Sequence, residues 1–127
     1  MDFTSNQPIY LQIADYVCEQ ILLKNWKLGD KIISIRELAI GMEVNPNTVQ
    51  RAYDFLQQKN IITNKRGVGY FTEEDAMDRI LAFRREQFMT NELPIFLKTI
   101  YLLKIDLRDV KAEYEKFVTN NFQKQSR

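Results

Sequence analysis

The sequence predicts a mainly α-helical chain that contains one small β-hairpin. Apolar residues recur at helical spacing in several segments, and turn residues or capping patterns separate these segments. One β-prone stretch, residues 61–72, instead surrounds a short glycine-containing tip, which is the pattern of a hairpin. A chain of 127 residues can form one domain or two very small ones.

The composition excludes several kinds of site and location. The chain has no histidine, which rules out Ser-His triads and histidine metal sites. Its one cysteine, Cys18, cannot form an internal disulfide, and we expect a buried apolar residue in a reducing compartment. Residues 1–7 are polar, and the most apolar segment, 93–103, is too short to span a bilayer. We therefore predict a soluble cytoplasmic protein with no catalytic residues, metal or cofactor.

Two helices are predicted first. Residues 8–24 carry apolar side chains at helical spacing, and Gly29-Asp30 then signals a turn. Ser34 and Glu37 have the spacing of a capping box, in which the serine oxygen accepts an N–H and the glutamate reaches back. This pair predicts a short helix over about 35–42.

A third helix is expected to begin within the stretch "VNPNTVQRAY". Asn45 can cap this helix, Pro46 suits its first position, and Asn60 can end it in the left-handed conformation. Its predicted core face consists of Val49, Ala52, Tyr53 and Leu56. A short capped helix followed directly by another helix is the layout of a helix-turn-helix.

The hairpin has a basic tip, "KRGVG". Lys65 and Arg66 supply charge, while Gly67 and Gly69 allow positive φ and close approach of the backbone. Such a tip can enter a minor groove, whose negative potential attracts arginine. The alternative is an exposed turn with solubilising charges. Three helices followed by this hairpin predict a winged helix-turn-helix DNA-binding domain over residues 1–72.

Residues 73–127 are predicted to form a short all-helical region. Thr72 and Asp75 resemble a helix cap, Pro94 fits a first helical turn, and Asp106 can begin the last helix. Helices are expected at about 73–90, 93–104 and 107–121.

The middle of this region, residues 93–103, reads "LPIFLKTIYLL" and is apolar on nearly every side. A helix of this kind is buried on more than one face, yet the region is too small to bury it well alone. We therefore expect a homodimer formed through residues 73–121. The alternative is burial within a single monomer.

The polar side of the third helix is the candidate DNA-reading surface. Asparagine and glutamine match adenine edges, threonine can contact a thymine methyl group or a phosphate, and a helix N-terminus favours phosphate. For Arg36, a DNA contact and a surface ion pair are equally good explanations. The alternative for the whole face is solvated surface, but the neighbouring helix and hairpin favour DNA binding. The candidate contacts are Arg36, Asn47, Thr48, Gln50, Arg51, Lys65, Arg66 and Gly67.

Over residues 8–71 the chain resembles the GntR family of bacterial transcription regulators. The matching pieces are "PIYLQIADYV", "LGDKIISIRELA", "VNPNTVQRAY" and "IITNKRGVGYF", and the short helical remainder is similar to the YtrA-type branch. The resemblance implies operator binding as a dimer, with contacts at Arg36, Asn47 and Thr48 and at the Arg66-Gly67 tip. Gln50 stands where relatives often carry arginine. The family often represses transporter or metabolic operons.

The sequence therefore predicts a DNA-binding transcription regulator, a repressor that binds an inverted-repeat operator as a homodimer. The main alternative is a winged-helix module whose polar third helix meets protein. An enzyme is a distant third, because the acidic residues at 73–78 fit a helix start better than a metal site. A small-molecule effector could bind between dimerised C-terminal helices, although no residue set marks such a site.

Overall fold

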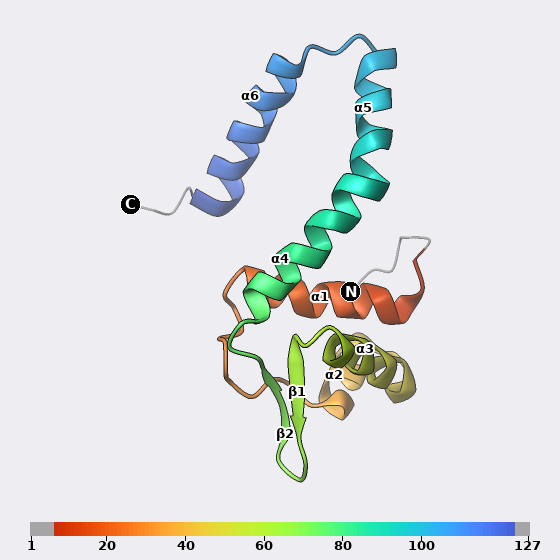
Figure 1. The fold of residues 1–127 in the computed structure, drawn as a ribbon, viewed down its shortest axis with the longest axis vertical. Helices are drawn as coiled ribbons and strands as arrows, with labels where there is room; N and C mark the ends of the chain where they lie inside the picture. Colours follow the sequence, from red (N-terminus) through yellow and green to blue (C-terminus); the bar gives the residue numbers. More distant parts are fainter. Residues whose placement is uncertain (1–6, 124–127) are drawn as a thin grey trace. The chain divides into compact units, whose positions relative to one another are not determined.

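The computed structural model describes residues 7–123 and divides the chain into two compact units, Met1–Arg84 and Arg85–Arg127. The first unit contains α1 (Ile9–Leu22), α2 (Ile35–Met42), α3 (Pro46–Gln58), β1 (Ile62–Lys65), β2 (Gly69–Thr72) and most of α4 (Ala76–Gln87). The second unit contains a π-helical turn (Phe88–Glu92), α5 (Leu93–Leu102), α6 (Leu107–Val118) and a second π-helical turn (Thr119–Gln123). The predicted class, a winged helix-turn-helix followed by helices, is confirmed (Figure 1).

The core of the first unit forms where α3 packs against α1 and α2. Ile13, Val17 and Ile21 of α1 are fully buried, as is the whole predicted core face of α3. That face consists of Val49, Ala52, Tyr53 and Leu56. Cys18 is also fully buried, as expected, and burial raises the pKa of its thiol to about 12. Because these four residues of α3 are buried in the core, the opposite, polar side of the helix faces solvent.

The starts of α2 and α3 follow the predicted caps. Ser34 Oγ accepts from the Glu37 N–H at 3.1 Å, and Glu37 Oε1 accepts from the Ser34 N–H at 3.4 Å, which completes the capping box. Asn45 Oδ1 accepts from the Asn47 N–H at 2.7 Å, and Pro46 occupies the first position of α3. Local side chains therefore fix where both helices of the helix-turn-helix begin.

Four helices, α1, α2, α3 and α5, end in the same way. Each is followed by a non-glycine residue with positive φ: Lys24 at 66°, Glu43 at 59°, Asn60 at 61° and Lys104 at 57°. The N–H of each donates to the carbonyl three residues back, and the next N–H donates to the carbonyl five back. This is the hydrogen-bond pattern of the Schellman motif. The predicted role of Asn60 is confirmed, and the motif also makes the tight turn between α2 and α3 at Glu43.

The hairpin pairs β1 with β2 in an antiparallel register from Ile62 opposite Thr72 to Lys65 opposite Gly69. Figure 1 shows it beside α3 with its tip pointing away from α1. A third segment, which the sequence did not predict, joins through an isolated bridge between Lys31 and Phe71. The chain before α2 is thereby attached to the hairpin.

The predicted cap at Thr72 is wrong. Thr72 is buried, and its hydroxyl donates to the Lys27 carbonyl at 2.8 Å, while the Glu73 N–H donates to the Ile61 carbonyl at 2.9 Å. Because Thr72 and Glu73 are hydrogen-bonded to these distant carbonyls and not to a following helical turn, α4 begins only at Ala76. Ala76 and Ile80 are fully buried in the core, so the compact unit runs past residue 72 to Arg84.

The second unit leaves most of its apolar side chains in solvent. None of its described residues, 85–123, is buried. Even large apolar side chains are exposed to solvent, Ile95 to 67 % and Tyr101 to 80 %. Its helix starts agree with prediction: Pro94 lies in the first turn of α5, and Asp106 caps α6 by accepting from the Arg108 N–H at 2.8 Å. Within residues 7–123, no helix combines the length and hydrophobicity needed to cross a membrane.

Candidate nucleic-acid interface

The start of α3 presents two predicted contacts that are open to solvent or nearly so. Asn47 is exposed, and its side chain forms no hydrogen bond with any described residue, since only its backbone N–H is used by the Asn45 cap. Thr48 is half-buried, with its N–H bonded to the Asn45 carbonyl at 2.9 Å. Asn45 and Pro46 thus build the helix start, which leaves the amide of Asn47 available for a ligand.

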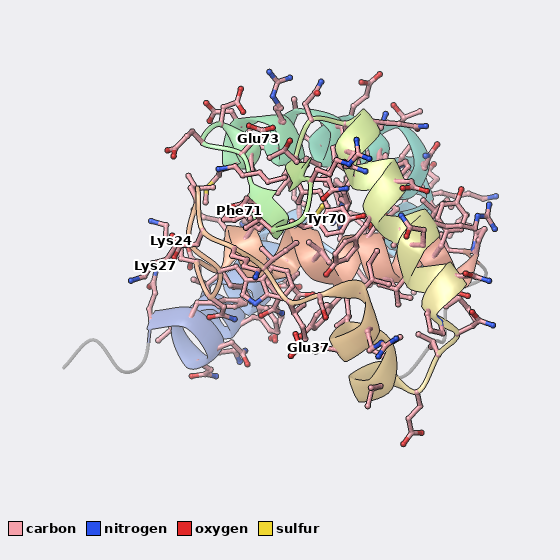
Figure 2. All side chains as sticks on the ribbon, turned by 90° about the horizontal axis from the view of Figure 1, so that it is seen from below. Lys24, Lys27, Glu37, Tyr70, Phe71 and Glu73 are labelled. Atoms are coloured by element: carbon pink, nitrogen blue, oxygen red, sulfur yellow. The ribbon has the colours of Figure 1, made fainter. Side chains whose placement is uncertain are left out.

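The side chain of Gln50, on α3, extends toward the hairpin. Its Nε2 donates to Asp54 Oδ1 at 2.9 Å and lies 3.5 Å from the hydroxyl of Tyr70. Tyr70 belongs to β2 and faces α3, whereas the neighbouring Phe71 lies on the side of the Lys24–Lys27 loop (Figure 2). Gln50 therefore brings the exposed face of α3 and the hairpin together.

Sequence reasoning missed Tyr70. Its ring meets the buried Tyr53 edge-on, with ring centroids 4.9 Å apart, and the Tyr53 hydroxyl donates to the Ile33 carbonyl at 2.7 Å. Burial raises the pKa of Tyr53, and Tyr70 and Tyr16 raise it further, so Tyr53 stays protonated and keeps this bond. Alternation along β2 was the available signal, because it puts Tyr70 and Phe71 on opposite faces.

Arg51 lies on the side of α3 that faces α1. Its guanidinium carbon is 4.0 Å from the centroid of the Tyr10 ring, which is a cation–π arrangement. Tyr10 in turn meets Phe55 edge-on, and Phe55 meets Phe83 of α4 in the same way. Arg51 is exposed and so remains a candidate contact, but it also has a packing role that the sequence did not predict.

Arg36 is the second residue of α2 and is exposed. The predicted alternative, an ion pair with a nearby carboxylate, is absent from the part of the chain that the structure describes. The adjacent Glu37 is instead engaged with Ser34 in the capping box. The charge of Arg36 is consequently unpaired by any residue in 7–123.

The hairpin tip carries two cationic side chains, of which Lys65 contacts an aromatic ring and Arg66 has no partner among the described residues. Lys65 Nζ lies 4.4 Å from the centroid of the Phe71 ring, while Arg66 has no hydrogen bond or ion pair to any residue in 7–123. Gly67 has a φ of 78°, and nothing lies within 4 Å of where a Cβ would stand, so its surroundings are open. At Gly69 a Cβ would stand 2.7 Å from Lys31 Cε, which brings Lys31 beside the tip.

The predicted contacts therefore fall into four places. Asn47, Thr48 and Gln50 lie on the α3 face, Arg51 lies against α1, and Arg36 lies on α2. Lys65, Arg66 and Gly67 lie at the hairpin tip. No group of three or more acidic or cysteine side chains in the described ranges is arranged to hold a metal ion.

Comparison with known proteins identifies the family of this fold. Residues 9–72 match the family described as "Bacterial regulatory proteins, gntR family". The chain belongs to this family. The GntR membership and the YtrA-like character predicted from the sequence are confirmed.

Two sequence relatives and one solved structure illustrate the similarity of this GntR-family chain to known proteins. The HTH-type transcriptional regulator YhcF of Bacillus subtilis (strain 168) is 46 % identical over 74 residues, which cover 58 % of this chain and 61 % of YhcF. The HTH-type transcriptional repressor YtrA of the same organism is 43 % identical over 76 residues, which cover 60 % of this chain and 58 % of YtrA. The structure of a GntR family transcriptional regulator from Listeria monocytogenes aligns with a TM-score of 0.72 at 34 % identity, and the alignment covers 90 % of this chain and 98 % of that one.

Proposed function

We propose that this chain is a sequence-specific DNA-binding transcription regulator that represses its target genes from an inverted-repeat operator. The observation that carries the proposal is the exposed start of α3, where the side chain of Asn47 has no partner among the described residues, beside a hairpin whose Arg66 is unpaired by any described residue. The name of YtrA, a transcriptional repressor, supports the choice of repression. We place this activity in the bacterial cytoplasm, where operator DNA is found.

In this mechanism α3 is the recognition helix and enters the major groove. The amides of Asn47 and Gln50 meet base edges, and Thr48 contacts a phosphate or a thymine methyl group. Arg36 and Lys65 neutralise phosphates, while Arg66 enters the adjacent minor groove behind the open Gly67 turn. Phosphate contacts set the register of the protein on the duplex, and α3 supplies the sequence preference.

The second unit supplies the dimer in this proposal. Its helices α5 and α6 expose many apolar side chains, and an exposed apolar surface of this kind marks a site of protein association. The unit has too few residues to bury these side chains itself. A second copy of the chain provides a matching apolar surface and a second recognition helix related by two-fold symmetry. Two equivalent recognition helices select an inverted repeat. An effector bound between the dimerised helices stays a prediction.

Selection from a random duplex library by the full chain, followed by sequencing, tests this function. We expect an inverted repeat to be enriched, with binding that falls steeply as salt rises because counterions are released. Arg36→Ala and Arg66→Ala should each weaken binding and lower the salt slope by about one unit. Arg79→Ala is the matched control, because Arg79 is already paired with Asp75 at 2.9 Å. A chain that enriches no sequence would instead fit the protein-interaction alternative.

A further inference from the structure

The side-chain amide of Gln50 is held at its nitrogen. Nε2 donates to Asp54 Oδ1 at 2.9 Å, one helical turn further along α3, and the Tyr70 hydroxyl lies 3.5 Å away on β2. Asp54 is exposed and forms no ion pair with any residue in 7–123, so its carboxylate is free to hold the amide. One strong contact and one longer contact therefore act on the same nitrogen.

The chemistry of the partners decides which way this amide points. An ionised carboxylate only accepts hydrogen bonds, so the nitrogen of Gln50, and not its oxygen, must face Asp54. This assignment follows from the hydrogen-bonding partners, as amide orientations should. The oxygen, Oε1, is left facing away and receives no hydrogen bond from any described residue. Gln50 thus presents an acceptor to whatever α3 meets.

The hairpin side of this arrangement is rigidly supported. The Tyr70 ring packs edge-on against Tyr53, which is fully buried and bonded through its hydroxyl to the Ile33 carbonyl. A ring braced by the core keeps its hydroxyl in one place. Tyr70 therefore places a fixed hydroxyl 3.5 Å from the Gln50 nitrogen, which opposes rotation of the amide.

We propose that Asp54, assisted by Tyr70, is a positioning residue that fixes the Gln50 amide with its oxygen outward, so that the operator carries adenine or cytosine where Gln50 reads. The inference rests on the proposed function. In the major groove, adenine N6 and cytosine N4 are donors, whereas guanine O6 and thymine O4 are acceptors. A freely turning glutamine can serve either kind of base edge, but a fixed one opposes guanine and thymine with acceptor against acceptor.

Library selection with the full chain and a set of variants tests this inference. Gln50→Ala first identifies the operator position that Gln50 reads, since only that position should lose its base preference. There the wild-type chain should favour adenine or cytosine over guanine and thymine by about tenfold or more. Asp54→Asn should reduce this ratio to within about twofold, because an amide at 54 can accept or donate and no longer fixes Gln50. Tyr70→Phe should reduce the ratio less.

The controls separate orientation from charge and from folding. Asp78→Asn removes the same charge from an exposed carboxylate on α4 that has no partner in the described chain, and it should leave every base preference unchanged. A general electrostatic effect at Asp54 would raise affinity for all sequences alike without changing their order. Thermal melting checks that each variant folds, and Asp54→Ala provides a second variant without the carboxylate.

The outcomes are distinct. A loss of preference confined to the Gln50 position in Asp54→Asn and Asp54→Ala supports the inference. Wild-type selection of guanine or thymine at that position, or an unchanged preference in both Asp54 variants, overturns it while leaving DNA binding intact. A wild-type chain that enriches no sequence overturns the proposed function itself.

Discussion

Replacing Asn45 by alanine should destabilise the fold without touching the proposed reading surface. In the structure Asn45 Oδ1 accepts from the Asn47 N–H at 2.7 Å, which satisfies one of the unpaired donors at the start of α3. Asn47→Ala is a matched control two residues away, since its side chain has no partner among the residues that the structure describes. The two substitutions remove the same amide group, but only one removes a hydrogen bond.

The expected size follows from the geometry. Loss of a helix cap lowers the free energy of unfolding by roughly 0.5–2 kcal/mol, and this cap is exposed, so water can partly replace it. We therefore expect about 1 kcal/mol for Asn45→Ala. For a domain the size of the unit that ends at Arg84, this corresponds to a fall in Tm of roughly 4–8 °C. Asn47→Ala should change the free energy of unfolding by less than about 0.5 kcal/mol.

Circular dichroism melts of the full chain, at two protein concentrations to separate any effect of assembly, measure the difference. Binding isotherms on selected and scrambled duplexes complete the comparison, because Asn47→Ala should lose roughly 1–3 kcal/mol of discrimination if Asn47 contacts a base edge. Equal Tm values for the two variants would refute the capping argument. Equal loss of affinity for both duplexes would make Asn47 a backbone contact.

Four further changes test other parts of the molecule. Gly67→Val should weaken operator binding while the core still melts cooperatively, because the positive φ is strained for valine although no atom obstructs its Cβ; unchanged affinity on a titration would count against the proposed wing contact. Lys65→Ala should weaken binding to all sequences alike and lower the salt slope by about one unit, measured by titration at several salt concentrations. A chain truncated after Arg84 should sediment as a monomer and bind the operator far more weakly, whereas a monomeric full chain at micromolar concentration would contradict the dimer. Burial raises the pKa of Cys18 from 9.0 to about 12, so its contribution to the free energy of unfolding should be constant below about pH 9 and fall as pH rises toward about 12; this alkaline slope should be smaller in Cys18→Ala by chemical denaturation.

The parts of the fold that the sequence predicted are those fixed by neighbours along the chain. The Ser34–Glu37 capping box and the Asn45 cap each depend on residues two or three positions apart, and both formed as expected. The hairpin tip likewise follows from the two glycines with positive φ at 67 and 69. Local chemistry also placed the polar face of α3, because the spacing of its buried residues leaves only one side outward.

Contacts between distant residues were beyond the reach of spacing arguments. Thr72 matched a cap pattern locally, but its hydroxyl bonds to a carbonyl 45 positions earlier in the chain. Tyr70 approaches Gln50 across 20 positions, and Arg51 meets Tyr10 on another helix. Nothing in the order of residues specifies these pairs until the elements have packed. The assignment of individual DNA contacts remains a prediction for the same reason, since it depends on how a duplex lies against the folded surface.

The repeated Schellman ends offer a route to a more heat-resistant protein. Lys24, Glu43, Asn60 and Lys104 all adopt the left-handed conformation at exposed positions where glycine is the usual residue. For residues other than glycine and asparagine this conformation is disfavoured by about 1–2 kcal/mol. Glycine at 24, 43 and 104 would relieve that strain without altering a candidate DNA contact. A variant combining all three could therefore gain several degrees in Tm and still select the same operator.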